Sequence, residues 1–179
     1  MKKYLFLLAS LVCGVALFTS CGSDDEPSGN YKASATYTIT FTDDLVSAAS
    51  PIIIYYKGTN NQTKRDIVTT KTWTKTIESD RFPVEFGYMI DAQSKDISEL
   101  TKEKYNLGFD SSIAVQVTEN GSVKYHQTFN NYSAPVEAKK DAVANAVSRS
   151  VNGKHLGVRI TKDRNNNISS STVTLDYDL

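Results

Sequence analysis

The chain has 179 residues, and its 20 lysines and arginines are balanced by 20 aspartates and glutamates, so the formal net charge is zero. A chain of this length suits one globular domain with a single hydrophobic core. Because no cluster of basic residues is visible, we expect no nucleic-acid partner, whose phosphates require concentrated positive charge.

The first 20 residues have the two regions of a secretory signal peptide. Lys2 and Lys3 precede an apolar stretch from Tyr4 to Phe18, and a basic head followed by an apolar core is typical of export signals. The apolar stretch of 15 residues is shorter than the roughly 20 that a membrane-spanning helix needs. We therefore expect residues 1–20 to direct export.

A cysteine follows the export signal directly. The segment Phe18-Thr19-Ser20-Cys21 resembles the lipobox of bacterial lipoproteins, with Phe18 at a position where Leu is usual. The resemblance implies that the Cys21 thiol is thioether-linked to diacylglycerol, that cleavage occurs on its amino side, and that the new N-terminus is acylated. Two or more acyl chains anchor a protein stably, because each buried CH₂ contributes about 0.8 kcal/mol.

The residues after Cys21 are small and acidic. The segment Gly22-Ser23-Asp24-Asp25-Glu26 resembles the export signal of surface lipoproteins of the Bacteroidetes. It implies that Ser23, Asp24, Asp25 and Glu26 send the protein to the outer leaflet of the outer membrane, at the cell surface; the alternative is an anchor that faces the periplasm. The resemblance covers residues 1 to about 26.

The composition also suggests where the domain begins. Residues 21–30 are rich in Gly, Ser, Pro and acids, which is typical of a flexible, solvated linker. We expect a signal peptide at 1–20, an acidic linker at 21–30 and one β-sandwich domain at 31–179.

Beyond residue 30, apolar and polar residues alternate with a period of two, as in half-buried strands. The first predicted strand spans residues 33–42 and has a face of threonines. The segment 52–56 is apolar on both faces and predicts a central strand. Further alternation predicts strands at 70–77, 84–90, 113–117, 123–129, 156–160 and 173–177. Asn120-Gly121 predicts a tight hairpin turn between two of them.

Two segments depart from this alternation. A helix is predicted over about Pro135–Val151, with Ser133 as its cap and Gly153 as its stop. Its expected buried stripe consists of Val136, Val143, Val147 and Val151. A shorter helical turn is predicted at Ser98–Lys104. We expect the long helix to lie across an open end of a sheet.

Seven or eight strands, with one helix inserted before the last two, favour a mainly β fold, a single antiparallel β-sandwich of immunoglobulin-like type. A lipocalin-like β-barrel is the alternative, because a strand count does not distinguish closure from stacking. The residues expected in one core are Phe41, Phe86, Val115, Tyr125 and Leu175. The residues expected on wet faces include Thr38, Thr74 and Lys124.

No motif for catalysis or metal binding stands out. The two histidines, His126 and His155, have no accompanying catalytic signature, so we expect a non-catalytic protein without a cofactor. Asp163-x-Asn165-x-Asn167 matches the opening of a calcium loop, but Ile168 stands where that loop requires Gly. We therefore expect a hairpin turn there and no metal site.

Aromatic residues carry the one binding signal. Trp73 shares a predicted strand face with Lys71 and Lys75, and Tyr55 lies on the apolar central strand. Sugar rings stack on aromatic faces, although Trp73 also suits a core anchor past which lysines extend to water. We expect a lipid-anchored surface module for a glycan or a protein partner, with Trp73 and Tyr55 as candidate contacts. The alternative is a structural subunit of a fimbria or envelope complex that pairs through a strand edge.

The lipid anchor yields a direct prediction. Replacing Cys21 with Ala removes the thiol to which lipid would be attached, so the protein should leave the membrane fraction and lose labelling by a fatty-acid probe. Cys13 lies inside the apolar core of the signal, so Cys13→Ala should change neither result. Labelling that persists in Cys21→Ala would contradict the assignment.

Overall fold

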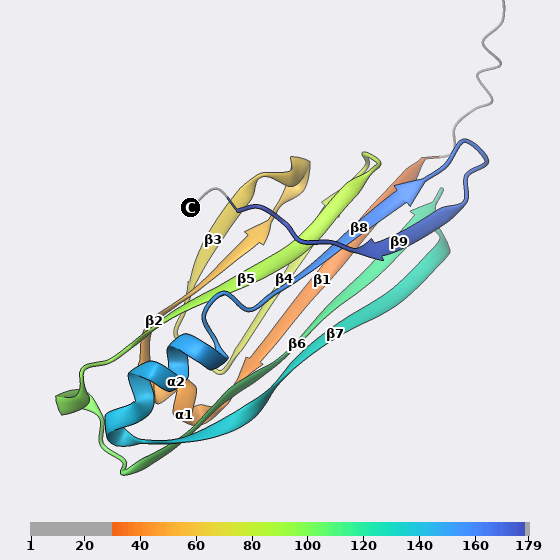
Figure 1. The fold of residues 1–179 in the computed structure, drawn as a ribbon. Coiled ribbons are helices and arrows are strands. Elements are labelled where there is room, and N and C mark those ends of the chain that lie inside the picture. The colour runs from red at the N-terminus through yellow and green to blue at the C-terminus, as the bar shows by residue number, and fades with distance from the viewer. Residues whose placement is uncertain (1–29, 178–179) are drawn as a thin grey trace, which may run out of the picture.

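A computed structural model of the chain describes residues 30–177. The predicted lipidation residue Cys21 and the export residues Ser23, Asp24, Asp25 and Glu26 lie outside the described residues. Nine strands form two antiparallel sheets that stack face to face (Figure 1). The predicted sandwich is confirmed.

The two sheets have separate edges. The first has the order β4 (Thr72–Ser79), β1 (Tyr31–Phe41), β6 (Lys104–Glu119), β7 (Ser122–Lys139). The second has the order β3 (Thr63–Val68), β2 (Ala49–Lys57), β5 (Val84–Ser94), β8 (His155–Lys162), β9 (Ile168–Thr172). Because neither sheet pairs its own two edges, the lipocalin-like barrel is wrong for the described residues.

The period-two pattern correctly identifies the dry faces of the central strands. Phe41, Phe86 and Val115 are buried between the sheets, as predicted. Tyr125 is only half-buried, because β7 is an edge strand whose side chains have neighbours on one side alone. Tyr125 is therefore less buried than predicted. Leu175 is buried, but it lies outside the core in which it was predicted, as described below.

Two tyrosine hydroxyls cross the core in opposite directions. Tyr37 on β1 donates to the carbonyl of Lys57 at 3.1 Å and accepts from the amide of Gly87 at 3.1 Å, both in the other sheet. Tyr88 on β5 bonds the Ser111 hydroxyl, which donates to the Asn131 carbonyl at 2.9 Å. Burial raises the pKa of Tyr37 and of Tyr88 above the ordinary phenol value. The hydroxyls therefore stay neutral and tie the sheets together.

The Asn120-Gly121 hairpin is confirmed. Strands β6 and β7 pair on both sides of it, and both turn residues have positive φ, 49° for Asn120 and 83° for Gly121. Two successive residues with positive φ are the signature of a type I′ turn, whose twist matches that of the flanking strands.

The predicted helix begins much later than expected. Strand β7 continues to Lys139, a 3₁₀ turn follows at Lys140–Ala142, and α2 spans only Val143–Ser150. Residues 136–139 pair with 104–107 of β6, and these ladder hydrogen bonds override the local helix propensity of an Ala- and Lys-rich segment. Val136 is accordingly 41% exposed.

The predicted buried stripe and the stop residue of this helix are largely confirmed, but the predicted cap is wrong. Val143, Val147 and Val151 are buried as one stripe, and Gly153 ends the segment with a φ of 71°. Ser133 is not a cap, because its hydroxyl donates to the carbonyl of Ser150 at the other end of α2.

Two short helical elements differ from the prediction. The turn expected at Ser98–Lys104 is a 3₁₀ turn at Ile97–Glu99, where Asp96 and Glu99 form a reciprocal capping box. Helix α1 (Asp43–Ala48) was not predicted. The Thr42 hydroxyl caps it by accepting from the Leu45 amide at 3.3 Å, and Asp43 and Asp44 in the first turn favour a helix start electrostatically.

The predicted last strand, 173–177, is wrong. The last strand is β9, which ends at Thr172, and the chain then crosses over β8 and β5 (Figure 1). Leu175 packs against Gly87 and Gly157, where any Cβ would clash with it or with the crossing backbone. The two glycines thus make room for the crossing segment, and Leu175 is buried on the outside of its sheet.

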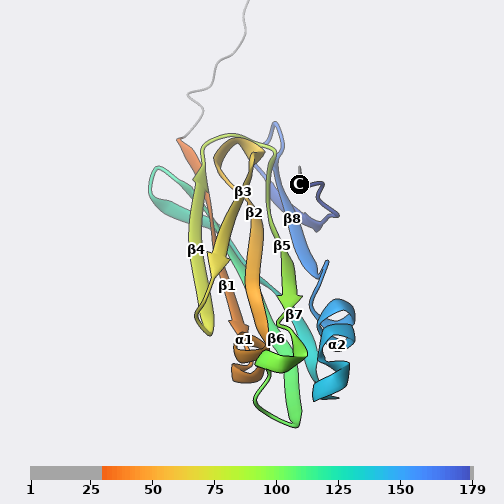
Figure 2. The ribbon, with the colours of Figure 1, turned by 90° about the vertical axis from the view of Figure 1, so that its left-hand side faces the viewer.

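The two ends of the sandwich are different. Strand β1 starts at one end, whereas α1, α2 and the 97–99 turn lie at the opposite end, which we call the distal end (Figure 2). Helix α2 contacts strands of both sheets there. Among residues 30–177, no helix is long and apolar enough to cross a membrane.

The core assignment predicts a large loss of stability on truncation. Phe86→Ala should lower the free energy of unfolding by about 3 to 5 kcal/mol, because it removes a fully buried ring and leaves a cavity. Thr74→Ser on an exposed strand position is the control and should change it by no more than about 0.5 kcal/mol. Urea midpoints of the mature protein measure both. A neutral Phe86→Ala would contradict the register.

The crossing tyrosines give a second stability prediction. Tyr37→Phe leaves the Gly87 amide and the Lys57 carbonyl buried without their partner, so unfolding should become easier by about 1 to 3 kcal/mol. Tyr132→Phe removes the hydroxyl of an exposed ring and should be neutral. Equal urea midpoints for Tyr37→Phe and the wild type would show that the cross-sheet bond adds no stability.

Candidate functional site

The structure places Trp73 in the core. Its side chain is 8% exposed and lies against the rings of Tyr37 and Tyr56, with centroids 6.1 and 5.5 Å away. Its indole Nε1 donates to Asp66 at 3.0 Å, and Lys75 donates to the same carboxylate at 3.2 Å. Trp73 thereby joins the edge strands β4 and β3 and closes one flank of the sandwich.

Asp66 is held ionised by this arrangement. Its partial burial would raise the pKa of the carboxyl, but hydrogen bonds from Trp73 and Lys75 outweigh that effect and lower it. The Asp66 cluster is therefore internally satisfied, and its polar atoms are engaged with one another.

The second predicted contact residue, Tyr55, lies on the other side of its sheet. It is half-buried on the outer face of β2, between Arg65 of β3 and Met89 of β5. Because Trp73 points into the core and Tyr55 points away from it, the structure does not bring the two residues together.

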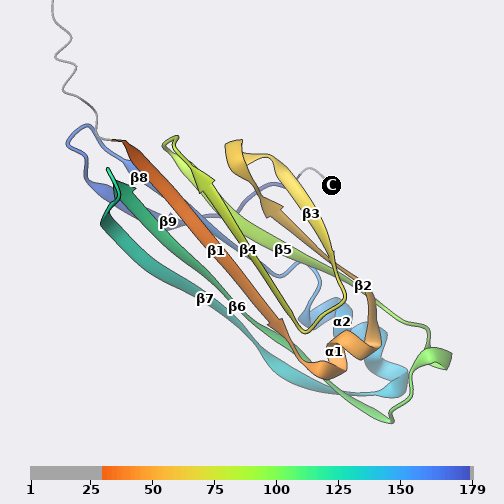
Figure 3. The same ribbon diagram turned by 180° about the vertical axis from the view of Figure 1, so that it is seen from behind.

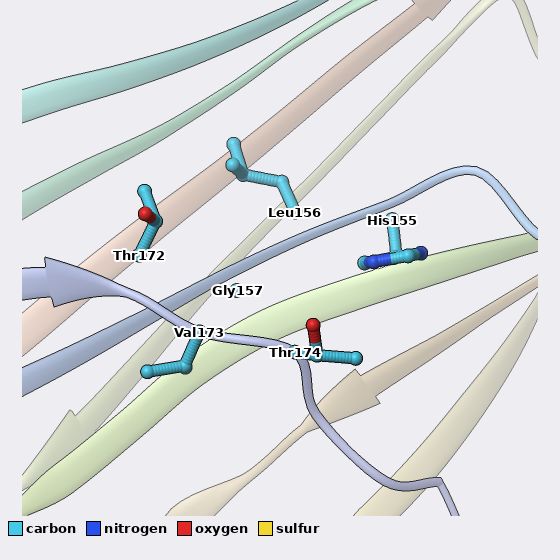
Figure 4. A pocket seen from close by; sticks show the side chains of 6 residues that line it. All are labelled: His155, Leu156, Gly157, Thr172, Val173 and Thr174. Atoms are coloured by element: carbon cyan, nitrogen blue, oxygen red, sulfur yellow. The ribbon is translucent and has the colours of Figure 1, made fainter.

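A shallow cavity of about 260 Å³ lies where the chain leaves β9. Its lining residues are His155, Leu156, Gly157, Thr172, Val173 and Thr174 (Figure 4). In this view Leu156 and Thr172 lie on one side of the β8 ribbon, and Val173 and Thr174 lie on the other. The exposed His155 has its Nδ1 3.0 Å from the Gly153 carbonyl. These side chains do not converge on a common point.

The distal end holds a more promising hollow. Two cavities, of about 190 and 360 Å³, share Thr42 and Lys71 as lining residues, and we call them together the distal groove. The first is lined by Thr40, Phe41, Thr42, Lys71, Phe109, Asp110, Tyr132, Ser133 and Pro135. The second is lined by Thr42, Asp43, Asp44, Lys71, Lys102 and Asn106.

Ion pairs build one wall of the distal groove. Asp44, whose side chain is 19% exposed, accepts from Lys102 at 2.5 Å and from the Asn106 amide at 2.7 Å. The hydrogen bond from Lys102, followed by that from Asn106, lowers the pKa of Asp44 below its usual value. Lys71 pairs with Asp43 at 3.1 Å. Asp44 thus ties α1 to β6 from a mostly buried position, whereas Asp43 and Lys71 form an exposed pair.

The opposite part of the groove carries an exposed aromatic ring. Tyr132 on β7 is 64% exposed, and Asp110 of β6 is its cross-strand partner. Thr40 of β1 is the next residue in the same row, because it pairs with Asp110. Within residues 30–177, the carboxylate of Asp110 makes no hydrogen bond or ion pair, so it is free to accept from a ligand.

Tyr132 is not among the contact residues predicted from the sequence. The predicted strand ends at Phe129 and the predicted helix begins at Pro135, so Tyr132 falls in an unassigned gap. Its alternation with Thr128 and Asn130 would have extended the strand, and this is the signal that marks it as an outer-face residue.

Metal binding has no support in the described part of the chain. No group of three or more His, Cys, Asp or Glu side chains is placed to hold an ion there. Asp163 instead accepts from the Asn165 and Asn167 amides, each at 2.8 Å, in the β8–β9 turn. The hairpin turn predicted at this motif is confirmed. His126 is exposed on β7, opposite Gln116.

Comparison with known proteins does not assign a family. No protein-family model matches the chain, and no curated protein matches its sequence. The chemistry of the distal groove is therefore what indicates a function.

Asp44 in the wall of the groove should stabilise the folded protein in a pH-dependent way. The pKa of Asp44 is lower in the folded protein than in the unfolded chain. Asp44 therefore makes its full contribution to the free energy of unfolding above its unfolded-state pKa of about 3.9. That contribution disappears as the pH falls through its folded-state pKa. Asp44→Asn should therefore lower the free energy of unfolding at pH 7 by about 1 to 3 kcal/mol. The difference in the free energy of unfolding between the wild type and Asp44→Asn should become smaller as the pH is lowered.

Asp43→Asn is the matched control for this experiment. Asp43 is 78% exposed in its pair with Lys71, so its replacement should cost no more than about 1 kcal/mol at any pH. Urea titrations of the mature protein between pH 7 and pH 3 separate the two cases. If the difference in the free energy of unfolding between the wild type and Asp44→Asn became larger at low pH, the lowered pKa of Asp44 would be contradicted.

Proposed function

We propose that the protein is a lipid-anchored, non-catalytic module of the cell envelope that binds glycan through the distal groove. The observation that carries the proposal is the exposed ring of Tyr132 beside the unpaired carboxylate of Asp110. Both lie in a hollow that also contains hydroxyl groups and lysines.

The chemistry of this hollow suits a sugar. The C–H face of a sugar ring is apolar and packs against an aromatic face, while its hydroxyls need donors and acceptors at the rim. Tyr132 supplies the ring, Asp110 supplies a strong acceptor, and Lys71 supplies donors. A charged acceptor forms stronger hydrogen bonds with hydroxyls than a neutral one.

The direction of the chain supports an outward-facing site. Lipid on Cys21 would connect to the domain through Asn30, and β1 begins at the end opposite the distal groove (Figure 2). An anchored domain would then point the groove away from the membrane. We propose the outer leaflet of the outer membrane, facing the cell exterior, as its location.

The proposal predicts that one exposed ring controls binding. Tyr132→Ala should weaken retention of the mature lipoprotein, purified in detergent, by at least about tenfold, as expected for a central aromatic contact. Affinity electrophoresis in gels that contain amylopectin, laminarin, xyloglucan or galactomannan measures the retention. Asp110→Asn should weaken it less, because the amide still accepts one hydrogen bond.

Tyr55→Ala is the matched control, since Tyr55 is a half-exposed tyrosine on the outer face of the other sheet. It should leave retention unchanged. If Tyr55→Ala lost retention and Tyr132→Ala kept it, the site would lie on the other sheet. If no neutral glycan retained the wild type, the proposal would be overturned.

An assembly subunit is the second candidate, favoured by one observation. Strand β7 is 18 residues long and forms an edge of its sheet, with Val123 57% exposed. Long edges of this kind can pair with a strand from another chain. Sedimentation of the purified lipoprotein with envelope extract tests it: Val123→Lys should abolish a co-sedimenting complex, whereas a complex that survives would exclude this edge.

A further inference from the structure

The outer face of the β4-β1-β6-β7 sheet is a broad array of uncharged polar side chains, most of them hydroxyls, which we call the hydroxyl face. It consists of Ser34, Thr36, Thr38, Thr40, Thr72, Thr74, Thr76, Ser112, Gln116, Thr128 and Asn130, with Ala114 among them. These residues alternate with buried neighbours along each central strand, so their side chains point outward.

The array is ordered in rows that run across the strands. One row is Thr76, Thr36, Ala114, Thr128, and the next is Thr74, Thr38, Ser112, Asn130. Hydroxyls of paired threonines lie close together, with 3.0 Å between the Oγ1 atoms of Thr36 and Thr76. Because β-branched side chains have few χ1 rotamers, these hydroxyls are held in place before any ligand arrives.

The two central rows contain no charged residue. An ion pair between Lys32 and Glu78, at 2.5 Å, lies near the end where β1 begins. Asp110 lies at the distal end, and His126 lies opposite Gln116. The neutral part of the face thus has charged groups only at its borders.

The outer face of the other sheet has a different character. It carries Arg65 on β3, Glu85 and Asp91 on β5, and Arg159 on β8. Arg159 and Glu85 form an ion pair at 2.5 Å. The neutrality of the hydroxyl face is therefore a property of one sheet and does not follow from the composition of the chain.

The hydroxyl face is open and continuous with the distal groove. Figure 3 shows the β4-β1-β6-β7 sheet in front, with α2 behind it and no described segment across its outer side. The row Thr72, Thr40, Asp110, Tyr132 joins the two surfaces, since Thr72 and Thr40 belong to the hydroxyl face and the other end of the row lines the groove together with Thr40.

We infer that the hydroxyl face extends the distal groove into one long site for a neutral, linear polysaccharide. This inference rests on the proposed function, because it assumes that Tyr132 stacks on a sugar. The polymer would run along the strands from Tyr132 toward the row of Ser34. Ser34 and Thr40 are six residues apart on β1, so this path is about 20 Å long.

The chemistry favours a neutral polymer over a charged one. Each threonine supplies one donor and two acceptor lone pairs, which complement the hydroxyls of a sugar. A polyanion would lose hydration over the central rows without gaining a cation there, and this loss is costly. Fixed hydroxyls also reduce the entropy lost on binding.

A length series tests the inference. The mature lipoprotein in detergent is titrated calorimetrically with oligosaccharides of increasing length from whichever neutral polysaccharide retains it. Affinity should continue to rise beyond the shortest fragment that binds, because longer fragments reach successive rows of threonines. Polygalacturonate, a polyanion, should bind more weakly than the neutral polymer.

Paired substitutions locate the extra contacts. A double variant that carries Thr74→Val and Thr128→Val loses two exposed hydroxyls but keeps the shape of the side chains. It should bind long fragments about tenfold more weakly. Binding of the shortest fragment should be unchanged. Thr161→Val, the same change on the outer face of the other sheet, is the control and should affect neither. Urea midpoints confirm that each variant is folded.

The outcomes separate the inference from the proposed function. If Tyr132→Ala abolishes binding while affinity is independent of length and unaffected by the threonine changes, the groove binds glycan and the hydroxyl face does not. If no neutral glycan binds the wild type, the proposed function and the inference both fail. Loss of long-fragment binding in Thr161→Val would also overturn the inference.

Discussion

The hydroxyl groups of Tyr37 and Tyr88 cross the dry interior in opposite directions, and the relative placement of the two sheets depends on them. The pairing of β2 with β5 ends at Tyr56 and Tyr88, and the Tyr37 hydroxyl then bridges the next two backbone groups, those of Lys57 and Gly87. A one-residue slip of β1 would turn Tyr37 to water and leave these groups buried without a partner. The hydrogen bonds therefore select one register, and with it the outward orientation of the alternating threonines.

The same register gives the two outer faces their different character, because it decides which side chains of each strand point outward. On β1, every residue between the buried Tyr31 and Phe41 that points outward is Lys, Ser or Thr, and the outward residues of β4 are three threonines followed by Glu78, which pairs with Lys32. The other sheet uses its outer face differently, because Gly87 and Gly157 leave room for the C-terminal segment with Leu175. One sheet is thus covered in part by its own chain, whereas within residues 30–177 no segment crosses the outer face of the other (Figure 3).

The distal groove arises where the strands of the open sheet end. Thr42 caps α1 through Leu45 and also accepts from the Gly108 amide at 3.2 Å, so one hydroxyl joins the end of β1 to β6. Asp44 then secures α1 to the beginning of β6 through Asn106. These bonds position Lys71, Asp43 and Lys102 around a hollow whose other side is Tyr132. The site depends on short polar contacts at strand ends, in contrast to the apolar core beneath it.

The sequence by itself determined the alternation of the central strands, the Asn120-Gly121 hairpin, the Asp163 turn and hence a mainly β antiparallel fold, because side-chain burial with a period of two and turn residues with positive φ are local properties. The tertiary structure decided that the strands form two stacked sheets and not a closed barrel. Only the tertiary structure decided that residues 136–139 pair with β6 instead of forming a helix, and that residues 173–177 cross the sheet. Both outcomes depend on partners distant in sequence, namely 104–107 for the first segment and Gly87 with Gly157 for the second. For the same reason the sequence indicated Trp73 as a possible core anchor, which the structure bears out, but it did not identify Asp66 as the partner of the indole. Tyr132 becomes a candidate contact only when β6 and β1 place Asp110 and Thr40 beside it, since a row across a sheet joins residues that no sequence spacing connects.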